Sequence, residues 1–347
     1  MAVYTTIDNP ELYFQAVIWT GNGSARSITF DNTDTSMQPD LVWAKSRSNA
    51  YNNCLIDSLR GVGKLIRSNQ TTAEETHATT VSAFNSNGFS LGGGDAFTNV
   101  DSATYVAWCW KANGSGSSNT AGSINTTATS ANTTAGISIV TWTGDENSSA
   151  TLGHGLGAVP KYIVTKGRTY ASSWATFHAS HGATKWFQGC ETDAVADNDQ
   201  IWNDTEPTST LFTVGASNQV NDAYNYVAYV FAEKQGFSKF GSYTGNSNAD
   251  GTFVYTGFRP AMVIVKRTDT TDDWFILDNK RNTYNPQNKY SMQDSSNAEA
   301  TYIFFDFLSN GFKIRSTGGG HNTGAYIFMA FAEAPFVNSK GVPCNAR

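Results

Sequence analysis

Short apolar and aromatic runs, separated by turn residues, recur along the whole chain. Residues 104–111 alternate between two faces with period two, and similar runs return at 224–232 and 325–333. Their length, their aromatic and β-branched content and the Gly and Asn residues around them are typical of strands. In the first third, helix-like composition is confined to residues 71–77, about two turns at most. The pattern therefore predicts an all-β fold.

The apolar runs belong to a module that is present three times. Each copy has a proline, a lysine six residues later, an Asp or His at eighteen, a phenylalanine at fifty to fifty-two and a tyrosine at sixty-six. A spacing held over this distance predicts a folded unit copied three times. The signature residues are Pro39, Lys45, Asp57, Phe89 and Tyr105, then Pro160, Lys166, His178, Phe212 and Tyr226, then Pro260, Lys266, Asp278, Phe312 and Tyr326.

The repeat period of about 100 residues predicts three tandem β-sandwich domains, jelly-roll-like or lectin-like in outline. We expect their boundaries at a leader 1–13, repeat 1 at 14–112, a Gly/Ser/Thr/Asn-rich linker 113–136, repeat 2 at 137–234, repeat 3 at 235–334 and a tail 335–347.

The two joins between repeats differ in length and composition. Residues 113–136 carry no charge and contain Ile124 as their only large apolar side chain. This composition predicts a flexible linker or, alternatively, an extended arm lying along a neighbouring domain or subunit. The second join, 233–236, is much shorter, so repeats 2 and 3 are expected in a fixed relation. Unequal joins argue against strict internal symmetry.

The lysine and the acidic residue of the signature flank a predicted hairpin. Lys45 with Asp57, and Lys266 with Asp278, are therefore candidate cross-strand ion pairs, worth less than about 1 kcal/mol if exposed. In repeat 2 the carboxylate is replaced by His178. The pair is therefore not an absolute requirement of the fold.

Composition narrows the range of partners. The net charge of −6 provides no basic field, which argues against nucleic acid. Four cysteines at unrelated positions of the repeats are expected to be free thiols. No apolar run approaches the roughly 20 residues that cross a bilayer, and the first residues do not resemble a signal peptide. We expect a protein made in a cytoplasm, without membrane insertion.

Several motifs resemble a known family. They are residues 39–47, 57–61 and 87–89, the stretch from 243 to 260, and the closing run 330–336 with the tail. Together they resemble a repeated domain of uncharacterised function in tail-fibre-like and other virion structural proteins of marine tailed bacteriophages. The resemblance implies a late structural protein located in the virion, with other copies of itself and other virion proteins as partners. It transfers no catalytic residue, cofactor or ligand site.

Candidate chemistry in the loops has ordinary alternatives. His178 and His181, with Cys190 nearby, suggest zinc, but residues three apart on a strand point to opposite faces, so we predict surface side chains and no metal site. The glycine-rich loops 92–95, 215–218 and 318–321 are interpreted as turns between strands. The alternative is a lectin-like site in which Asp95 and Asn99 bind a sugar or calcium.

Tryptophan placement raises the question of glycan binding. Five tryptophans in strand-like runs, from Trp19 to Trp142, are assigned to the core. Trp186 and Trp202 lie in the irregular middle of repeat 2 and are predicted to be exposed, contacting either a glycan or a neighbouring subunit. No pair of carboxylates stands out for glycoside cleavage.

These observations favour a non-enzymatic structural component of a tailed-phage virion, such as a tail fibre, appendage or surface protein, that acts through self-assembly and protein contacts. The alternative is a host-receptor module that binds surface polysaccharide, and a glycan depolymerase is a third possibility. The chain contains no heptad segment for a coiled-coil stem.

Overall fold

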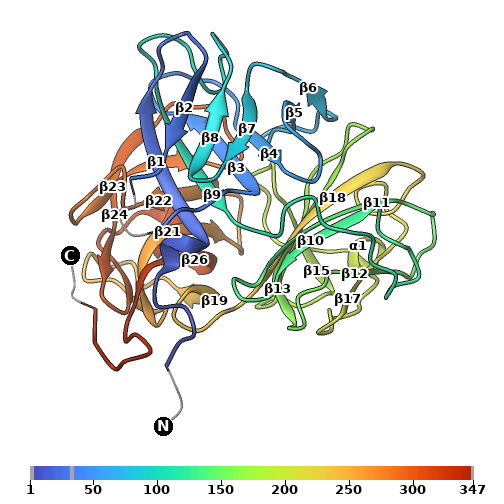
Figure 1. Cartoon of the computed structure of the whole chain (residues 1–347). Helices are drawn as coiled ribbons and strands as arrows, with labels where there is room; N and C mark the ends of the chain where they lie inside the picture. The colour runs from blue at the N-terminus through green and yellow to red at the C-terminus, as the bar shows by residue number, and fades with distance from the viewer. Residues whose placement is uncertain (1–3, 32–34, 345–347) are drawn as a thin grey trace.

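The computed structural model describes residues 4–31 and 35–344 and contains antiparallel sheets almost throughout (Figure 1). Its described helices are single turns: η1 (Pro10–Leu12), α1 (Asp199–Trp202) and α2 (Gly319–Asn322). The prediction of an all-β fold is confirmed. In this part of the chain, no helix has the length and apolar character required to span a membrane.

Repeat 1 contains a four-stranded sheet in the order β1-β9-β3-β4 and a three-stranded sheet in the order β2-β8-β7. A small pair, β5 with β6, lies at one end. The strands are β1 (Phe14–Thr20), β2 (Arg26–Thr29), β3 (Leu41–Ser46), β4 (Cys54–Asp57), β5 (Lys64–Leu65), β6 (Glu75–Thr76), β7 (Val81–Asn85), β8 (Gly88–Leu91) and β9 (Thr104–Trp110).

Repeat 2, together with the preceding tract, contains a seven-stranded sheet in the order β10-β11-β18-β13-β14-β15-β16 and the pair β12-β17. The strands are β10 (Ala128–Asn132), β11 (Ile137–Thr143), β12 (Ala150–Gly153), β13 (Pro160–Gly167), β14 (Ala175–His178), β15 (Lys185–Gln188), β16 (Ala196–Asp197), β17 (Leu211–Val214) and β18 (Asn225–Ala232).

Repeat 3 forms one nearly closed, barrel-like sheet of eight strands in the order β19-β26-β21-β22-β23-β24-β25-β20. The strands are β19 (Ser238–Thr244), β20 (Phe253–Tyr255), β21 (Phe258–Arg267), β22 (Trp274–Asp278), β23 (Gln287–Met292), β24 (Ala300–Leu308), β25 (Gly311–Ile314) and β26 (Ala325–Pro335).

The strands of the three repeats pair in the same way. In each repeat the closing strand lies between the first strand and the strand that carries the signature lysine: β1-β9-β3, β11-β18-β13 and β19-β26-β21. A second pair also recurs, as β2-β8, β12-β17 and β20-β25. Figure 1 shows the three sets as blue, green-to-yellow and orange-to-red lobes around a common centre.

The tract 113–136 is not a flexible linker. Its last part forms β10, which pairs with β11 in register, Ala128 opposite Thr141. Further upstream, Ile124 is buried and forms a parallel bridge with Leu152 of β12. The tract is an extended arm along repeat 2, because Ile124 gains a buried site and its backbone finds hydrogen-bond partners.

An aromatic trio forms the centre of each repeat. In repeat 1, Trp19 stacks on the signature Tyr105 at 5.4 Å between ring centroids and meets the edge of Phe89 at 5.8 Å. The corresponding trios are Trp142, Tyr226 and Phe212 in repeat 2, and Tyr243, Tyr326 and Phe312 in repeat 3. Two of the five signature positions therefore fill the core of each repeat.

The signature tyrosines also close a loop before the last strand. Each hydroxyl accepts a backbone N–H and donates to a carbonyl, so a buried polar group is satisfied. The donors to the hydroxyl and its acceptors are, in that order, Val100 N–H and Ala96 O for Tyr105, Asp222 N–H and Asn218 O for Tyr226, and Thr323 N–H and Gly319 O for Tyr326.

Candidate functional site: the junction of the three repeats

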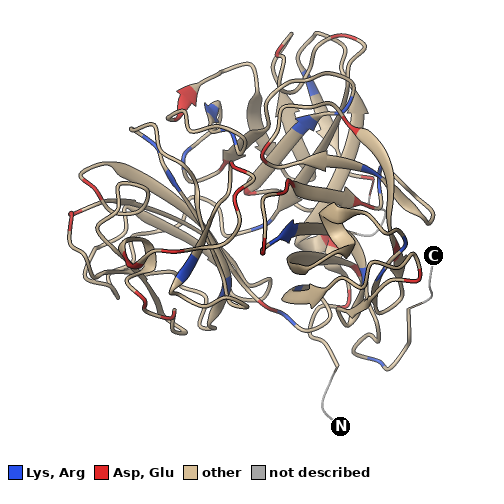
Figure 2. Ribbon diagram, turned by 180° about the vertical axis from the view of Figure 1, so that it is seen from behind, with Lys and Arg blue, Asp and Glu red and all other residues tan. Residues whose placement is uncertain are grey.

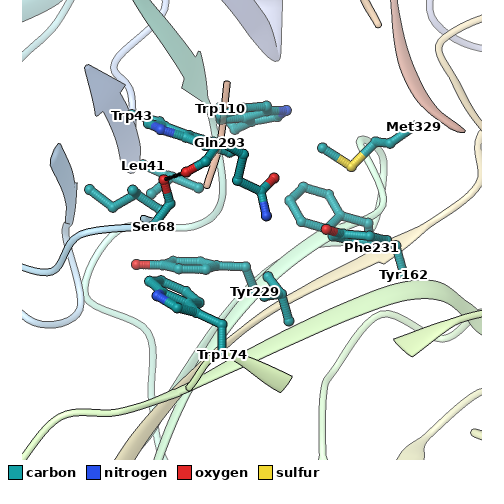
Figure 3. Close-up of a pocket in the computed structure, with 12 residues that line it drawn as sticks. Leu41, Trp43, Ser68, Trp110, Tyr162, Trp174, Tyr229, Phe231, Gln293 and Met329 are labelled. Atoms are coloured by element: carbon teal, nitrogen blue, oxygen red, sulfur yellow. Dashed lines mark hydrogen bonds between the residues drawn. The ribbon is translucent and has the colours of Figure 1, made fainter. Parts of the chain in front are cut away.

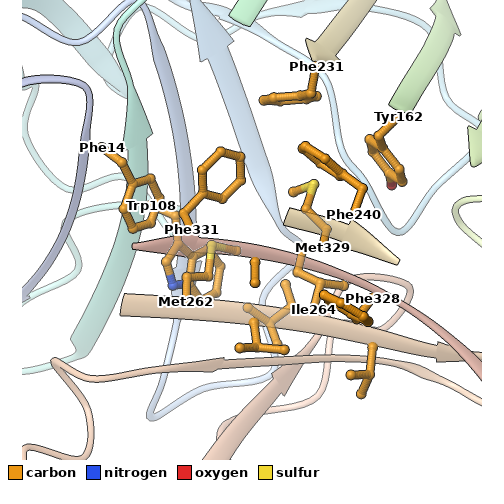
Figure 4. Packing of buried hydrophobic residues seen from close by; sticks show 14 of the residues in the cluster. Phe14, Trp108, Tyr162, Phe231, Phe240, Met262, Ile264, Phe328, Met329 and Phe331 are labelled. Carbon is orange, nitrogen blue, oxygen red and sulfur yellow. The ribbon is translucent and has the colours of Figure 1, made fainter. Parts of the chain in front are cut away.

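The closing strands of the three repeats meet at a triangle of aromatic rings. Trp110, Phe231 and Phe331 each lie five residues after the signature tyrosine of their repeat. Their ring centroids are 6.2 Å apart for Trp110 and Phe231, 5.5 Å for Trp110 and Phe331, and 5.8 Å for Phe231 and Phe331. Equivalent side chains thus surround one pseudo-threefold axis, and Figure 4 shows Phe14 packing beside Phe331 there.

A single apolar cluster connects all three repeats through this triangle. It contains residues of β9, β18 and β26 and extends into the sheet of repeat 3. Repeats 1 and 2 keep separate clusters of their own on the opposite face of their sheets. The faces of the closing strands that point away from these two clusters are therefore buried by the neighbouring repeats.

The three signature lysines link the repeats in a closed ring. All three are fully buried, and desolvation lowers their pKa to about 8. Each Nζ donates to the carbonyl six residues later in its own repeat and to one carbonyl of a neighbour. The bonds are Lys45 to Tyr51 O and Ser296 O, Lys166 to Ser172 O and Thr71 O, and Lys266 to Asp272 O and Thr192 O, at 2.6–3.0 Å.

The predicted cross-strand pairs of Lys45 with Asp57 and of Lys266 with Asp278 are wrong. Asp57 lies opposite Leu41, and Asp278 lies opposite Met262, so each acid is at the far end of the hairpin from its lysine. The register decides this, because facing residues of an antiparallel pair are set by where the turn falls. The lysines bind carbonyl groups instead.

The acids belong to a second buried network, which joins repeats 1 and 2. Asp57 binds Arg60 Nε at 2.5 Å, and both side chains are fully buried. Tyr229 of repeat 2 donates its hydroxyl to Asp57 Oδ2 at 2.8 Å. Glu74 completes the network between Arg60, at 3.2 Å, and Arg168 of repeat 2, at 3.0 Å.

The same network joins repeats 3 and 1. Asp278 binds Arg281 Nε at 2.6 Å and accepts the indole N–H of Trp108, in repeat 1, at 3.0 Å. Glu299 lies 3.6 Å from Arg281 and 2.8 Å from Arg47 of repeat 1. Trp108 and Tyr229 are equivalent, each three residues after the signature tyrosine.

The third joint, between repeats 2 and 3, replaces every charged member of this network. The position of Trp108 and Tyr229 is taken by Met329, which has no N–H or O–H to donate to an acid. His178 and His181 replace the acid and the arginine. Val195 and Thr268 replace the outer ion pair, which is Glu74 with Arg168 in one joint and Glu299 with Arg47 in the other. One backbone bond is common to all three joints: Glu74 N–H donates to Arg168 O, Glu299 N–H to Arg47 O, and Val195 N–H to Thr268 O at 3.1 Å.

His178 is buried in this joint, and not at a surface as expected. Its Nε2 lies 3.2 Å from Phe328 O in repeat 3, and its Nδ1 accepts the N–H of Ser180 at 3.1 Å. A neutral imidazole with its proton on Nε2 satisfies both partners. Burial lowers the pKa of His178 to about 4. His178 of repeat 2 therefore lies at the one joint of the three where Met329 offers no donor to an acid.

A small cavity lies beside the axis, between side chains of all three repeats (Figure 3). Its volume of about 30 Å³ corresponds to roughly one water molecule. Ser68 donates to the carbonyl of Gln293, and the Gln293 amide donates to Gly189 O. The space is too small for a sugar ring, although Trp43, Trp110 and Trp174 line it.

The two tryptophans predicted to contact a glycan or a neighbouring subunit lie inside repeat 2. Trp186 is 8% exposed and Trp202 is 2% exposed, so the prediction of an exposed pair is wrong. Trp186 lies in β15, and Trp202 ends α1 and meets the edge of Phe177 at 6.1 Å. These elements fold over the sheet, which the irregular local sequence does not reveal.

The loop residues Asp95 and Asn99 bind their own chain. Asn99 accepts the N–H of Asn22 and donates to Ser24 O and Gly92 O, while Asp95 accepts the N–H of Phe97. Asn221 and Asn322 make the equivalent bonds to the residue after the Thr-Gly turn of their repeats. The described residues contain no group of three or more His, Cys, Asp or Glu side chains arranged for a metal ion.

Sequence reasoning missed most of the junction. A signal for Arg60 and Arg281 was present, because both lie three residues after a signature acid. A signal for the aromatic triangle was present as well, at the fifth position after each signature tyrosine. Neither pattern says which repeat faces which, so the partners across the joints were not predictable.

Comparison with known proteins and protein families gives one match, to a family model. No curated protein matches the chain, and no solved structure matches it. Residues 9–335 match the family model described as a domain of unknown function, DUF7483, so the match spans all three repeats and the arm between the first two. The chain therefore belongs to the DUF7483 family.

Proposed function

We propose that the chain is a non-enzymatic structural component of a tailed-phage virion, such as a tail fibre, appendage or surface protein. It acts through contacts with copies of itself and with other virion proteins. The observation that carries the proposal is the ring of buried joints. The side chains that recur in all three repeats hold the repeats together, and the cavity between them has room for about one water.

We further propose that the repeats are three tandem β-sandwiches, jelly-roll-like or lectin-like, held as one rigid pseudo-trimer. The recurring strand orders and the aromatic triangle support this arrangement. Such a unit matches a threefold position in a symmetric particle, because three similar lobes present three similar surfaces. Nucleic acid is not a partner in this proposal. Figure 2 supports that choice, since basic and acidic residues are interspersed in its view.

The proposal is tested on particles of a phage that encodes this chain. Virions purified by density gradient are analysed by mass spectrometry and by electron cryo-microscopy. We expect the chain at a fixed copy number, with three-lobed density at a repeated position on the particle. Absence of the chain from washed particles that contain the major capsid protein would overturn the proposal.

The host-receptor alternative loses its specific support with the burial of Trp186 and Trp202. Glycan-array binding by the intact chain, compared with release of sugar from host envelope, distinguishes receptor from depolymerase. Saturable binding without sugar release would favour the receptor function.

A further inference from the structure

Repeat 2 shows how this fold fills the space between its first two strands. The arm occupies the gap between β11 and β12. β10 pairs with β11, and Thr127 N–H donates to Thr141 O at 2.7 Å. On the other side, Ile124 N–H donates to Thr151 O of β12 at 3.1 Å. One extended segment thus binds the free edges of both strands.

The equivalent gap in repeat 3 is an open groove. It lies between β19 and β20, the two end strands of the nearly closed sheet, and has a volume of about 500 Å³. The equivalence follows from the pairing, because Val254 lies opposite Phe312 as Leu152 lies opposite Phe212. β19 lines one wall of the groove and β20 the other.

The wall formed by β19 presents free backbone groups. Along an antiparallel pair, every second residue bonds the partner strand through its N–H and C=O. Gly245 N–H donates to Gly324 O, so the backbone N–H and C=O of Tyr243, two residues earlier, also point toward β26. Ser242, the residue before Tyr243, therefore directs its N–H and C=O into the groove. Within the described residues these two groups have no hydrogen-bond partner. Thr244 points the same way, and its carbonyl accepts the hydroxyl of Thr252 at 2.8 Å. Ser242 is the equivalent of Thr141, whose carbonyl binds the arm in repeat 2.

The side chains that line the groove favour an uncharged occupant. Phe253 is 43% exposed and Tyr255 is 52% exposed, both on β20. Lys239 is the one charged residue among those that line the groove, and it is paired with Glu233 at 2.7 Å. The groove therefore offers aromatic surface without an unpaired charge, as suits a segment like the arm, whose residues 113–136 are all uncharged.

We propose that the β19–β20 groove is a strand-acceptor site for an extended, uncharged, Ser/Thr-rich segment of another polypeptide. The segment adds to β19 as β10 adds to β11, so that main-chain bonds supply affinity and the aromatic side chains of β20 supply selectivity. A different polypeptide is the occupant because, in a second copy of this chain, the corresponding arm is bound to its own repeat 2. The site does not depend on the virion assignment.

The test uses the full chain and a fluorescein-labelled synthetic peptide of residues 116–132. Fluorescence anisotropy is expected to show saturable binding. Ser242→Pro removes the N–H in the groove, and Phe253→Glu introduces a charge on the opposite wall, so each is expected to weaken binding at least tenfold. Tyr284→Lys is the matched control, since Tyr284 is 76% exposed and does not line the groove. Its affinity is expected to equal that of the unmodified chain.

A second peptide tests the role of main-chain pairing. Replacing Thr127 by Pro in the peptide removes the N–H that binds Thr141 O in repeat 2, so this peptide is expected to bind at least tenfold more weakly. Circular dichroism checks the fold of each variant. If Ser242→Pro fails to fold, Phe253→Glu still tests the site.

Three outcomes would overturn the proposal. The first is no binding of the peptide up to millimolar concentration. The second is binding that survives Phe253→Glu, which would place the peptide on repeat 2 by displacement of the arm. The third is dimerisation of the chain alone that Phe253→Glu abolishes, measured by analytical ultracentrifugation, which would make a second copy the occupant.

Discussion

At the residue scale, one donor determines the chemistry of each joint. Trp108 and Tyr229 donate to a buried aspartate, which in turn binds a buried arginine. Met329 cannot donate, and the acid at that joint is replaced by His178. A buried carboxylate without enough partners is costly, whereas a neutral imidazole needs only one acceptor and one donor.

The state of His178 makes stability depend on pH. Its folded pKa of about 4 lies below the ordinary 6.5, so between these values the unfolded chain binds more protons than the folded chain. The free energy of unfolding is therefore expected to fall as pH decreases from 6.5 to 4, by about 3 kcal/mol from this group. Urea titrations across this range, on the wild type and on His178→Gln, measure the effect.

His178→Gln keeps a donor and an acceptor but does not titrate, so it isolates the histidine from the acidic groups of the chain. The variant is expected to lose less stability than the wild type over the same pH range. Equal losses in the two proteins would show that the folded pKa of His178 is not lowered and would contradict its burial as a neutral imidazole.

Removal of Asp57 tests the buried ion pair. Asp57→Ala leaves the fully buried Arg60 without its nearest anion and Tyr229 without its acceptor. We expect a loss of about 3–5 kcal/mol in the free energy of unfolding, measured by urea denaturation. Asp31→Ala is the control, because Asp31 is 71% exposed in its pair with Lys280 and is worth less than about 1 kcal/mol. Similar losses in both variants would contradict the assignment.

At the scale of elements, the arm between repeats 1 and 2 is an integral part of the sheet of repeat 2. Its polar residues satisfy the free edge of β11, and Ile124 anchors it in the apolar cluster of that repeat. An edge strand covered in this way is protected from pairing with other chains. Among the described residues, no strand pairs with the same edge in repeat 3, and the strand-acceptor proposal rests on this difference.

Loss of the anchor is expected to release the arm. Ile124→Ser removes buried apolar surface and should lower the free energy of unfolding by about 2 kcal/mol. Hydrogen exchange at the amides of β10 and β11 should become faster than in the wild type. Ile18→Ser is the control, because Ile18 on β1 is 42% exposed, and its effect is expected within about 0.5 kcal/mol. Unchanged protection of β10 in Ile124→Ser would show that the backbone bonds alone hold the arm.

At the scale of the whole molecule, the joints form a closed ring of three. Each repeat contacts both others through a buried lysine, a backbone bond and a face of its closing strand. The unequal joins, which argued against internal symmetry, are accommodated because the longer one folds back along repeat 2. Separation of one repeat would expose the large aromatic cluster and would remove, at each broken joint, the lysine's acceptor in the neighbouring repeat.

We therefore expect the three repeats to unfold as one unit. Differential scanning calorimetry of the full chain should give a single transition with equal calorimetric and van't Hoff enthalpies. Phe331→Ala, which removes one ring of the triangle, should lower the free energy of unfolding by about 3–5 kcal/mol. Three separate transitions in the wild type would contradict the ring as a cooperative unit.

The all-β class, the repeat period and the signature positions can be predicted from the linear pattern, because alternation along a strand and spacing between copies are properties of that pattern. The sequence correctly assigned Trp19 and Trp142 to the core, since both lie in apolar strands. It suggested the wrong partner for Lys45, because the register of the hairpin is not encoded in the spacing of two residues.

The binding partners of the recurring residues depend on how the three repeats pack together. The burial of Trp186 depends on elements that fold over it, and the roles of Lys45, Asp57 and His178 depend on which repeat docks beside them. These are contacts between segments far apart in the chain, and their geometry follows from the packing of three sheets around one axis. The arm pairs with the edge of β11, whereas β19 ends its sheet.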